Sequence, residues 1–364
     1  MTKRKIVIIV LLCVVSTMTL FSAMHFVGDD YILNYVRQLT VDNVNDGVHF
    51  VKSSDTATVF TDDNTLRVLQ LSDLHIVAST FTRSTDKQSV DAVVDIIEST
   101  RPDLVIITGD LTYSIPPLGN INNKLAYQTV GTLMEKFNIP WTLTFGNHDQ
   151  DPFLMYNKQK QAEYYSSLNN CLMYSAAEVD GYGNHVVMFD SNGNNNTALI
   201  MLDCLGYDLF PFKYATFSDS QVSWYSKTVT QLNTQSLLFT HVPLKEYDNA
   251  LQLYNNGEAE ILNGTTSKRV ASADTSNGLF DEIVKHGSTK AVFCGHDHTN
   301  NWAIRYQGVA LCYGMSIDCI AYPGIANSTV QRGGRLIEID ADGTITLSMV
   351  PQDNNYQPTD AVTL

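Results

Sequence analysis

Short apolar runs alternate with stretches of helical spacing through the first half of the chain. Residues 66–72, LRVLQLS, form a β-branched apolar run that predicts a strand, and residues 88–99 place apolar side chains at helical spacing. The fully apolar run 104–107 predicts a second strand, residues 124–137 a second helix and residues 141–145 a third strand. This alternation favours a parallel sheet covered by helices.

The second half of the chain is richer in strands. Runs 185–190 and 198–203, joined by a loop of Gly and Asn, predict a hairpin. Helices are expected at 218–232 and 277–287. Further strands are predicted at 236–241, 291–294, 302–308, 309–314, 334–340 and 345–350. The sum is a mixed α/β domain, in which we expect two sheets packed face to face with helices outside.

The N-terminal residues carry the longest apolar run of the chain. A basic stretch, TKRK, precedes 22 uncharged residues, 6–27. About 20 such residues can span a bilayer as a helix, and a basic flank places the N-terminus inside and the following domain outside. We therefore expect a signal anchor at 1–27. A cleaved signal peptide is the alternative, although Phe21 stands where its cleavage site requires a small residue.

Composition divides the remainder of the chain into three parts. Residues 28–63 are polar, with scattered Asp, Asn and Thr, and predict a stalk or linker with one short strand at 57–60. Residues 64–350 contain the other predicted elements and form the folded domain. Residues 351–364 are expected to be a C-terminal tail.

Charge and cysteine content restrict the partners. The chain has 23 Lys and Arg against 38 Asp and Glu, a net charge of −15. Nucleic-acid binding rests on a basic surface, so we expect no nucleic-acid partner, and nuclease activity is disfavoured. An anionic substrate would need local positive charge, which bound metal ions can supply. Five cysteines outside the N-terminal run include no CxxC pair, which disfavours a zinc ribbon and allows two disulfides at most.

Five predicted strands end in residues that can bind metal ions. The carboxyl ends of strands form the ligand-binding edge of open α/β sheets, so we expect these side chains to meet. An ordinary turn or core role is the alternative for each residue alone, but five of nine histidines occur at such ends. The candidate ligands are Asp73, His75, Asp110, Asn147, His241, His296 and His298.

The types of these residues indicate a particular chemistry. Carboxylate, amide and imidazole groups suit Fe, Mn or Zn. Two such ions about 3.5–4 Å apart can clamp the attacking and leaving oxygens of a phosphoryl displacement and lower the pKa of a shared water. The sequence GHDH at 295–298 would give one imidazole to each ion. Asp297 should point to the opposite side of an extended chain, so we place it outside the ligand set.

The motifs DxH, GD, GNHD, a single His and GHxH, in this order over residues 66–300, resemble the calcineurin-like metallophosphoesterase superfamily. GNHDQD, THVPL and GLFDEI…KAVFCGHDH are similar to its purple-acid-phosphatase-related branch that carries DxH. The joint pattern is specific, whereas each motif alone is weak. The resemblance implies an α/β β-sandwich of two mixed sheets flanked by helices. It also implies a dinuclear metal site that hydrolyses phosphate esters with metal-bound hydroxide.

The resemblance assigns roles as well. One ion would be held by Asp73, His75 and His298, the other by Asn147, His241 and His296, with Asp110 as bridge. His148, paired with Asp149 or Asp73, would protonate the leaving oxygen or steady the phosphate.

The sequence GDLTY raises a further candidate, Tyr113. Purple acid phosphatases use the tyrosine of GDxxY as an iron ligand, but they have Gly where this chain has His75. If His75 fills that coordination position, Tyr113 need not bind metal and no purple colour is expected.

Together these patterns predict a membrane-anchored phosphatase with its catalytic domain outside the cytoplasm, or a secreted one if the N-terminal run is cleaved. We expect a phosphorylated small-molecule or lipid substrate, with monoesters first. Hydrolysis of phosphodiesters, in lipid head groups or nucleotides, is the alternative. A second alternative is a binding protein that has the same fold but no catalytic activity.

Overall fold

The computed structural model describes residue 16 and residues 27–364, except 46, 62, 116, 153, 192–193, 210–211, 267–268 and 322–331. No helix in this described part is both long and apolar enough to cross a membrane. The predicted membrane segment lies outside the described residues apart from its positions 16 and 27.

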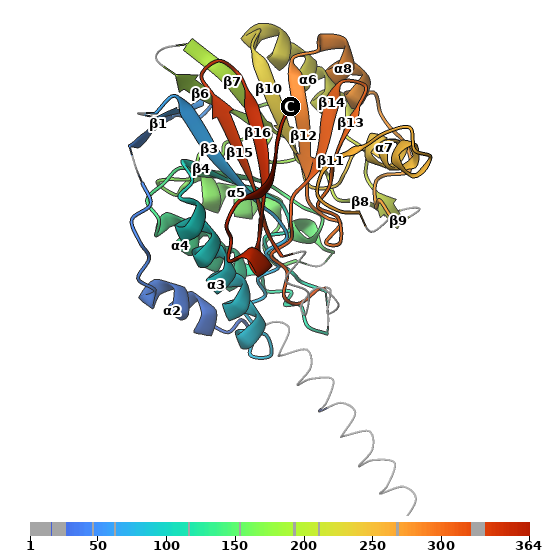
Figure 1. The fold of residues 1–364 in the computed structure, drawn as a ribbon. Helices are drawn as coiled ribbons and strands as arrows, with labels where there is room; N and C mark the ends of the chain where they lie inside the picture. Colours follow the sequence, from blue (N-terminus) through green and yellow to red (C-terminus); the bar gives the residue numbers. More distant parts are fainter. Residues whose placement is uncertain are drawn as a thin grey trace, which may run out of the picture.

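Two mixed sheets form the centre of the molecule (Figure 1). In the six-stranded sheet the order is β17 (Thr359–Thr363), β16 (Ile345–Pro351), β15 (Gly333–Asp340), β3 (Thr65–Leu71), β4 (Leu104–Thr108) and β5 (Trp141–Thr144). In the nine-stranded sheet it is β1 (Val48–Lys52), β2 (Ala57–Thr61), β6 (His185–Ser191), β7 (Asn194–Met201), β10 (Gln235–Phe239), β12 (Thr289–Cys294), β14 (Val309–Tyr313), β13 (Ala303–Tyr306) and β11 (Ile261–Asn263). A small hairpin joins β8 (Tyr207–Leu209) to β9 (Phe212–Tyr214).

Helices cover the outer faces of both sheets, as the sequence pattern predicts. On the six-stranded side are α2 (Tyr31–Gln38), α3 (Arg83–Thr100), α4 (Lys124–Glu135) and α5 (Lys158–Ser166). On the nine-stranded side are α6 (Asp219–Leu232), α7 (Lys245–Asn255) and α8 (Leu279–His286). Two 3₁₀ turns complete the described elements, η1 (His148–Gln150) and η2 (Gln352–Asn354).

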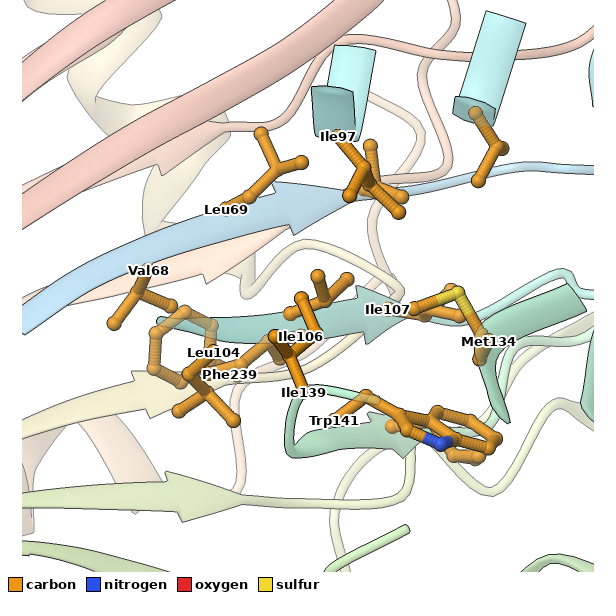
Figure 2. Packing of buried hydrophobic residues seen from close by; sticks show 14 of the residues in the cluster. Val68, Leu69, Ile97, Leu104, Ile106, Ile107, Met134, Ile139, Trp141 and Phe239 are labelled. Atoms are coloured by element: carbon orange, nitrogen blue, oxygen red, sulfur yellow. The ribbon is translucent and has the colours of Figure 1, made fainter. Parts of the chain in front are cut away.

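Alternation along the central strands separates two apolar layers. In β10, Leu237 and Phe239 pack between the sheets, whereas Leu238 packs under the outer helices. The rings of Phe239 and Phe293 stack at 4.9 Å across neighbouring strands. Figure 2 shows Phe239 in the same apolar cluster as Leu104 of the other sheet. This core holds the two sheets together and fixes where their strand ends lie.

The predicted stalk is wrong for the described part of residues 28–63. Helix α2 buries Ile32 and Val36 against α3 and α4, and β1 and β2 extend the nine-stranded sheet. Ile32, Leu33 and Val36 lie on one face of a single short helix, so the apolar pattern is too brief to stand out against its polar surroundings.

The predicted C-terminal tail is likewise part of the domain. Strand β17 pairs with β16, and Tyr356 is buried in the apolar core. Helices α5 and α7 were also missed, because their segments contain many polar residues. The helix predicted at 218–232 is confirmed and begins with a capping box between Ser218 and Gln221.

Candidate metal centre

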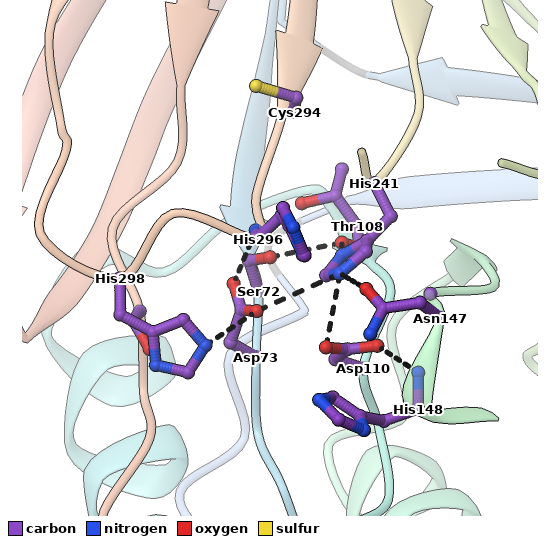
Figure 3. Close-up of polar contacts among 12 residues, drawn as sticks. Ser72, Asp73, Thr108, Asp110, Asn147, His148, His241, Cys294, His296 and His298 are labelled. Atoms are coloured by element: carbon purple, nitrogen blue, oxygen red, sulfur yellow. Dashed lines mark hydrogen bonds and ion pairs between the residues drawn. The ribbon is translucent and has the colours of Figure 1, made fainter. Parts of the chain in front are cut away.

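The structure brings the candidate side chains together at the carboxyl ends of five strands, drawn from both sheets (Figure 3). Most of them are buried, so their positions are set by the core rather than by mobile loops. Asp73 and His75 follow β3, Asp110 follows β4, Asn147 and His148 follow β5, His241 follows β10, and His296 and His298 follow β12.

One group consists of Asp73, His75 and His298, whose ligand atoms lie within 4.8 Å of one another. His298 Nε2 is 3.1 Å from Asp73 Oδ1 and 3.3 Å from His75 Nε2. All three side chains are buried. This is the size and burial expected of a coordination shell for one cation.

A second group consists of Asp110, His241 and His296, with Asn147 beside it. His241 Nε2 lies 3.1 Å from Asp110 Oδ2 and 3.2 Å from Asn147 Oδ1. Asp110 Oδ2 is also 3.6 Å from His75 Nε2. One carboxylate oxygen therefore faces both groups, as a bridging ligand would.

The donors fit metal ions by their hydrogen-bond chemistry. His241 Nδ1 lies 2.7 Å from the carbonyl oxygen of Thr108, which can only accept, so Nδ1 carries the proton. In the neutral ring, the lone pair on Nε2 then faces the oxygens of Asp110 and Asn147. Asp73 Oδ1 is buried without a hydrogen bond. Acceptors that face each other in this way need a positive charge between them, which either a metal ion or a proton on the imidazole can supply.

The two imidazoles of the second group, His241 and His296, have pKa values shifted in opposite directions. Burial alone would lower the pKa of His241, but the adjacent Asp110 carboxylate outweighs burial and raises this pKa to about 9. Burial and the neighbouring His241 lower the pKa of His296 to about 3. His296 is therefore neutral at physiological pH, which is the form that binds metals.

Asp318 supports the first group and was missed in the sequence. Its Oδ2 lies 3.1 Å from His298 Nδ1, while its Oδ1 accepts hydrogen bonds from the backbone of Ile320 and Ala321. A carboxylate behind a ligating imidazole fixes the ring and its tautomer. Asp318 follows no strand-end motif, so no local signal marks it.

His148 has a different partner from the two that the sequence suggested. Its Nδ1 lies 3.1 Å from both carboxylate oxygens of Asp151, three residues along in the turn of η1. Asp149 instead accepts hydrogen bonds from the backbone of Leu111, Thr112 and Gly146, tying together the ends of β4 and β5. The His148 backbone N–H donates to Asp110 Oδ1 at 2.8 Å, which orients the candidate bridge.

Tyr113 and Tyr207 are among the tyrosines that border the centre. The Tyr113 ring lies 5.3 Å from the His75 ring and 5.0 Å from the His148 ring. Tyr207 accepts a hydrogen bond from Asn147 Nδ2 at 2.6 Å, which leaves Asn147 Oδ1 directed to His241. Tyr207 lies on the β8–β9 hairpin, which the sequence did not predict.

The backbone of the centre is strained. Asp73, His75, Asp110 and His296 all have positive φ, between 50° and 74°. Non-glycine residues rarely adopt this region, and clusters of such residues are typical of functional sites. A Cβ atom on Gly146 would lie 2.1 Å from Asp110 Oδ1, so the motif GNHD requires glycine for this close approach.

Other sequence expectations are resolved nearby. Asp297 points away from the centre, as predicted, and accepts hydrogen bonds from Tyr313 and Ala271. The five described cysteines are buried and free, so no disulfide forms among them. His185 is a core residue that bonds Thr142 and the Gly183 carbonyl.

A sandwich that gathers two carboxylate–imidazole groups at its strand ends has the donor set of a metal-dependent hydrolase. The family model described as "Calcineurin-like phosphoesterase" matches residues 66–300, and the chain belongs to this family. The predicted family is thus confirmed.

Individual relatives agree with this membership. "Probable inactive purple acid phosphatase 14" from Arabidopsis thaliana is 24% identical over 325 residues, covering 79% of this chain and 78% of that protein. "Phosphatase DCR2" from Saccharomyces cerevisiae is 26% identical over 287 residues, 70% of this chain and 48% of that protein. The crystal structure of a dimetal phosphatase from Danio rerio has a TM-score of 0.51 at 13% identity, covering 82% and 98% of the two chains, and shares the fold.

Proposed function

We propose that the protein is a phosphatase that hydrolyses phosphate monoesters with the help of two metal ions. The observation that carries this proposal is the convergence of the candidate ligands into two groups that share Asp110 Oδ2. Asp73, His75 and His298 would hold one ion, and Asn147, His241 and His296 the other, with Asp110 between them. When bound, the ions would neutralise phosphate charge and lower the pKa of a water molecule. Iron, manganese and zinc all suit these donors.

His148 is placed to handle the proton of the leaving group. Burial alone would lower its pKa, but the carboxylates of Asp110 and Asp151 outweigh burial and raise the pKa of His148. With Nδ1–H directed to Asp151, Nε2 is free to give its proton to the departing oxygen. Asp151 would act as a positioning residue for this ring.

A silent binding protein is the principal competing function, because several relatives are named as probable inactive phosphatases. Loss of activity in such a fold is expected to begin with loss of ligands. This chain has kept an oxygen or nitrogen donor at all seven ligand positions. The complete set favours an active enzyme.

A comparison of two chromogenic esters tests the proposed substrate class. We expect kcat/KM for p-nitrophenyl phosphate to exceed that for bis(p-nitrophenyl) phosphate by at least about tenfold, or ~1.4 kcal/mol of transition-state free energy. The physical reason is that the dianionic monoester gains more from two cations. A higher kcat/KM for the diester would favour the phosphodiesterase alternative. If metal-loaded protein hydrolyses neither ester, the silent binding protein is favoured.

Asp318→Asn should weaken metal binding without removing a ligand. Asparagine keeps the shape and can still accept from the backbone, but it removes the negative charge behind His298. We expect a loss of about 10- to 100-fold in affinity for one metal equivalent, measured by calorimetric titration of the apoprotein with Mn²⁺. An unchanged binding isotherm would show that Asp318 has no such role.

We also propose that residues 1–27 anchor the protein in a membrane with the catalytic domain outside the cytoplasm. The support is the basic flank and the uncharged run of 22 residues. We expect the full chain to remain in the membrane pellet after alkaline carbonate extraction, and a chain lacking residues 6–27 to be released. Release of the full chain would instead support a cleaved signal peptide.

A further inference from the structure

Large apolar side chains are exposed around the metal centre. Among the described residues, nine large hydrophobic residues are exposed, and five of them lie on segments that border the strand ends of the candidate site. Val27 and Phe81 are the most exposed of these, at 68% and 63%. Single exposed apolar residues are ordinary, but a group on one edge marks an interaction surface. The five are Val27 before α2, Phe81 after β3, Ile115 and Leu118 after β4, and Met155 after β5, called here the apolar rim.

Backbone and side-chain contacts connect neighbouring segments of the rim. The Asp29 N–H donates to the Ala78 carbonyl at 2.9 Å, and Arg83 pairs with Asp29 at 2.7 Å. Gly28 lies against α4, since a Cβ atom built on it would be 2.7 Å from Leu125 Cδ1. The segments after β4 and β5 meet where the Met155 N–H donates to the Ile121 carbonyl at 3.1 Å.

A surface hollow of about 660 Å³ opens between two of these segments. Val27, Gly28 and Asp29 line one side, and Phe81 and Arg83 line the other. The start of the described domain and the segment that follows a candidate metal ligand therefore share one solvent-exposed depression.

The end of the apolar N-terminal run is close to the metal centre along the backbone. Val27 is two residues from Asp29, a span of at most about 7 Å. Ala78, which holds Asp29, is three residues from His75, at most about 11 Å. Because no stalk separates Val27 from the domain, an anchor that ends there would hold this edge of the domain at the bilayer surface.

We propose that the apolar rim rests on the membrane and that the metal centre acts on the phosphomonoester group of a lipid in that membrane. The proposal rests on the phosphatase function and on the N-terminal anchor argued above, and it names their substrate class. A soluble phosphate ester would gain nothing from exposed Phe81, Leu118 and Met155, whereas a lipid substrate requires the site to approach the head-group layer.

The contact would be apolar rather than electrostatic. The chain carries a net charge of −15, so long-range attraction to an anionic surface is not expected. Arg83, which lies beside the rim, forms an ion pair with Asp29. Contact should therefore persist at high salt, unlike that of a polybasic segment.

Fluorescence quenching tests the contact without reference to activity. The described cysteines are buried, so a thiol-reactive fluorophore can be placed at Phe81→Cys or Leu118→Cys in a Cys13→Ala background. Val51→Cys and Val284→Cys are matched controls, exposed apolar positions on β1 and α8. The full chain is reconstituted in phosphatidylcholine vesicles that contain doxyl-labelled phosphatidylcholine. We expect strong quenching at 81 and 118 and little at 51 and 284; equal quenching at all four positions overturns the proposal.

Activity in the same vesicles tests the substrate. Phosphatidic acid is the lipid phosphomonoester, and p-nitrophenyl phosphate is the soluble one. The ratio of lipid to soluble hydrolysis should fall about tenfold in Phe81→Ser or Leu118→Ser, as for removal of one apolar side chain from an apolar phase. It should not change in Val51→Ser or Val284→Ser.

The outcomes separate this inference from the function on which it rests. Hydrolysis of p-nitrophenyl phosphate without hydrolysis of phosphatidic acid overturns the lipid substrate and leaves the phosphatase function standing. If neither ester is hydrolysed, the phosphatase function is refuted and the lipid substrate with it. The quenching experiment still decides whether the rim contacts the membrane.

Discussion

Asp110→Asn is expected to reduce kcat/KM for p-nitrophenyl phosphate by at least about a thousandfold, or ~4 kcal/mol, the scale of transition-state charge stabilisation by metal ions. The expected cause is specific: Asp110 Oδ2 faces His75 at 3.6 Å and His241 at 3.1 Å. Asparagine preserves the shape and the hydrogen bond from His148, but a neutral amide cannot bridge two cations as a carboxylate does.

Asp297→Asn is the matched control for this experiment. Asp297 lies between two candidate ligands in the sequence, yet its carboxylate bonds Tyr313 and Ala271, away from both groups. Its amide variant should retain activity within a few-fold. Full activity in Asp110→Asn, or an equal loss in both variants, would contradict the assigned bridge. Circular dichroism of each variant confirms that the fold is intact.

His148→Asn should produce a loss that depends on the leaving group. For β-glycerophosphate, whose alkoxide leaves poorly without a proton, we expect kcat to fall by about 10²- to 10⁴-fold. For p-nitrophenyl phosphate the loss should be clearly smaller, because nitrophenolate leaves without protonation. The comparison of the two substrates is therefore the measurement, with metal content as a check that the site remains assembled.

Asp151→Asn extends this test through the positioning residue. Its carboxylate holds His148 Nδ1 at 3.1 Å, so its removal should give a weaker loss with the same dependence on leaving group. An equal loss for both substrates in His148→Asn would show that His148 binds the phosphate rather than protonates the leaving oxygen.

The sequence predicted the strands that carry the site because their signals are local. Runs such as LVII at 104–107 and AVFC before Gly295 are fully apolar, as buried parallel strands are. Each ends in a polar motif whose position on the sheet edge follows from the strand direction. The grouping of Asp73 with His75 and His298, and of Asp110 with His241 and His296, agrees with the grouping that the family resemblance implied.

The features that the sequence did not reveal depend on contacts across the fold. Asp318 reaches His298 from a segment with no strand-end motif. Asp151 rather than Asp149 meets His148 because the 3₁₀ turn brings residues three apart onto one side. These side chains have no periodicity or spacing that marks them in one sequence.

Helix α2, within the predicted stalk, is a whole element that could not be recognised from its own sequence. Helix α2 is only eight residues long and its apolar side is narrow, so its pattern resembles that of a polar linker. Only the surfaces of α3 and α4 make its burial favourable. Because no stalk follows it, Val27, the last residue of the N-terminal run, lies beside Phe81 in the segment that follows His75.

Inductively coupled plasma mass spectrometry of the purified full chain measures whether the protein holds two metal ions. We expect two equivalents of iron, manganese or zinc per chain in the wild type and in Asp297→Asn. Asp73→Ala and His296→Ala should each lose at least one equivalent. A folded wild-type protein that retains no metal after dialysis against each of the three ions would contradict the account.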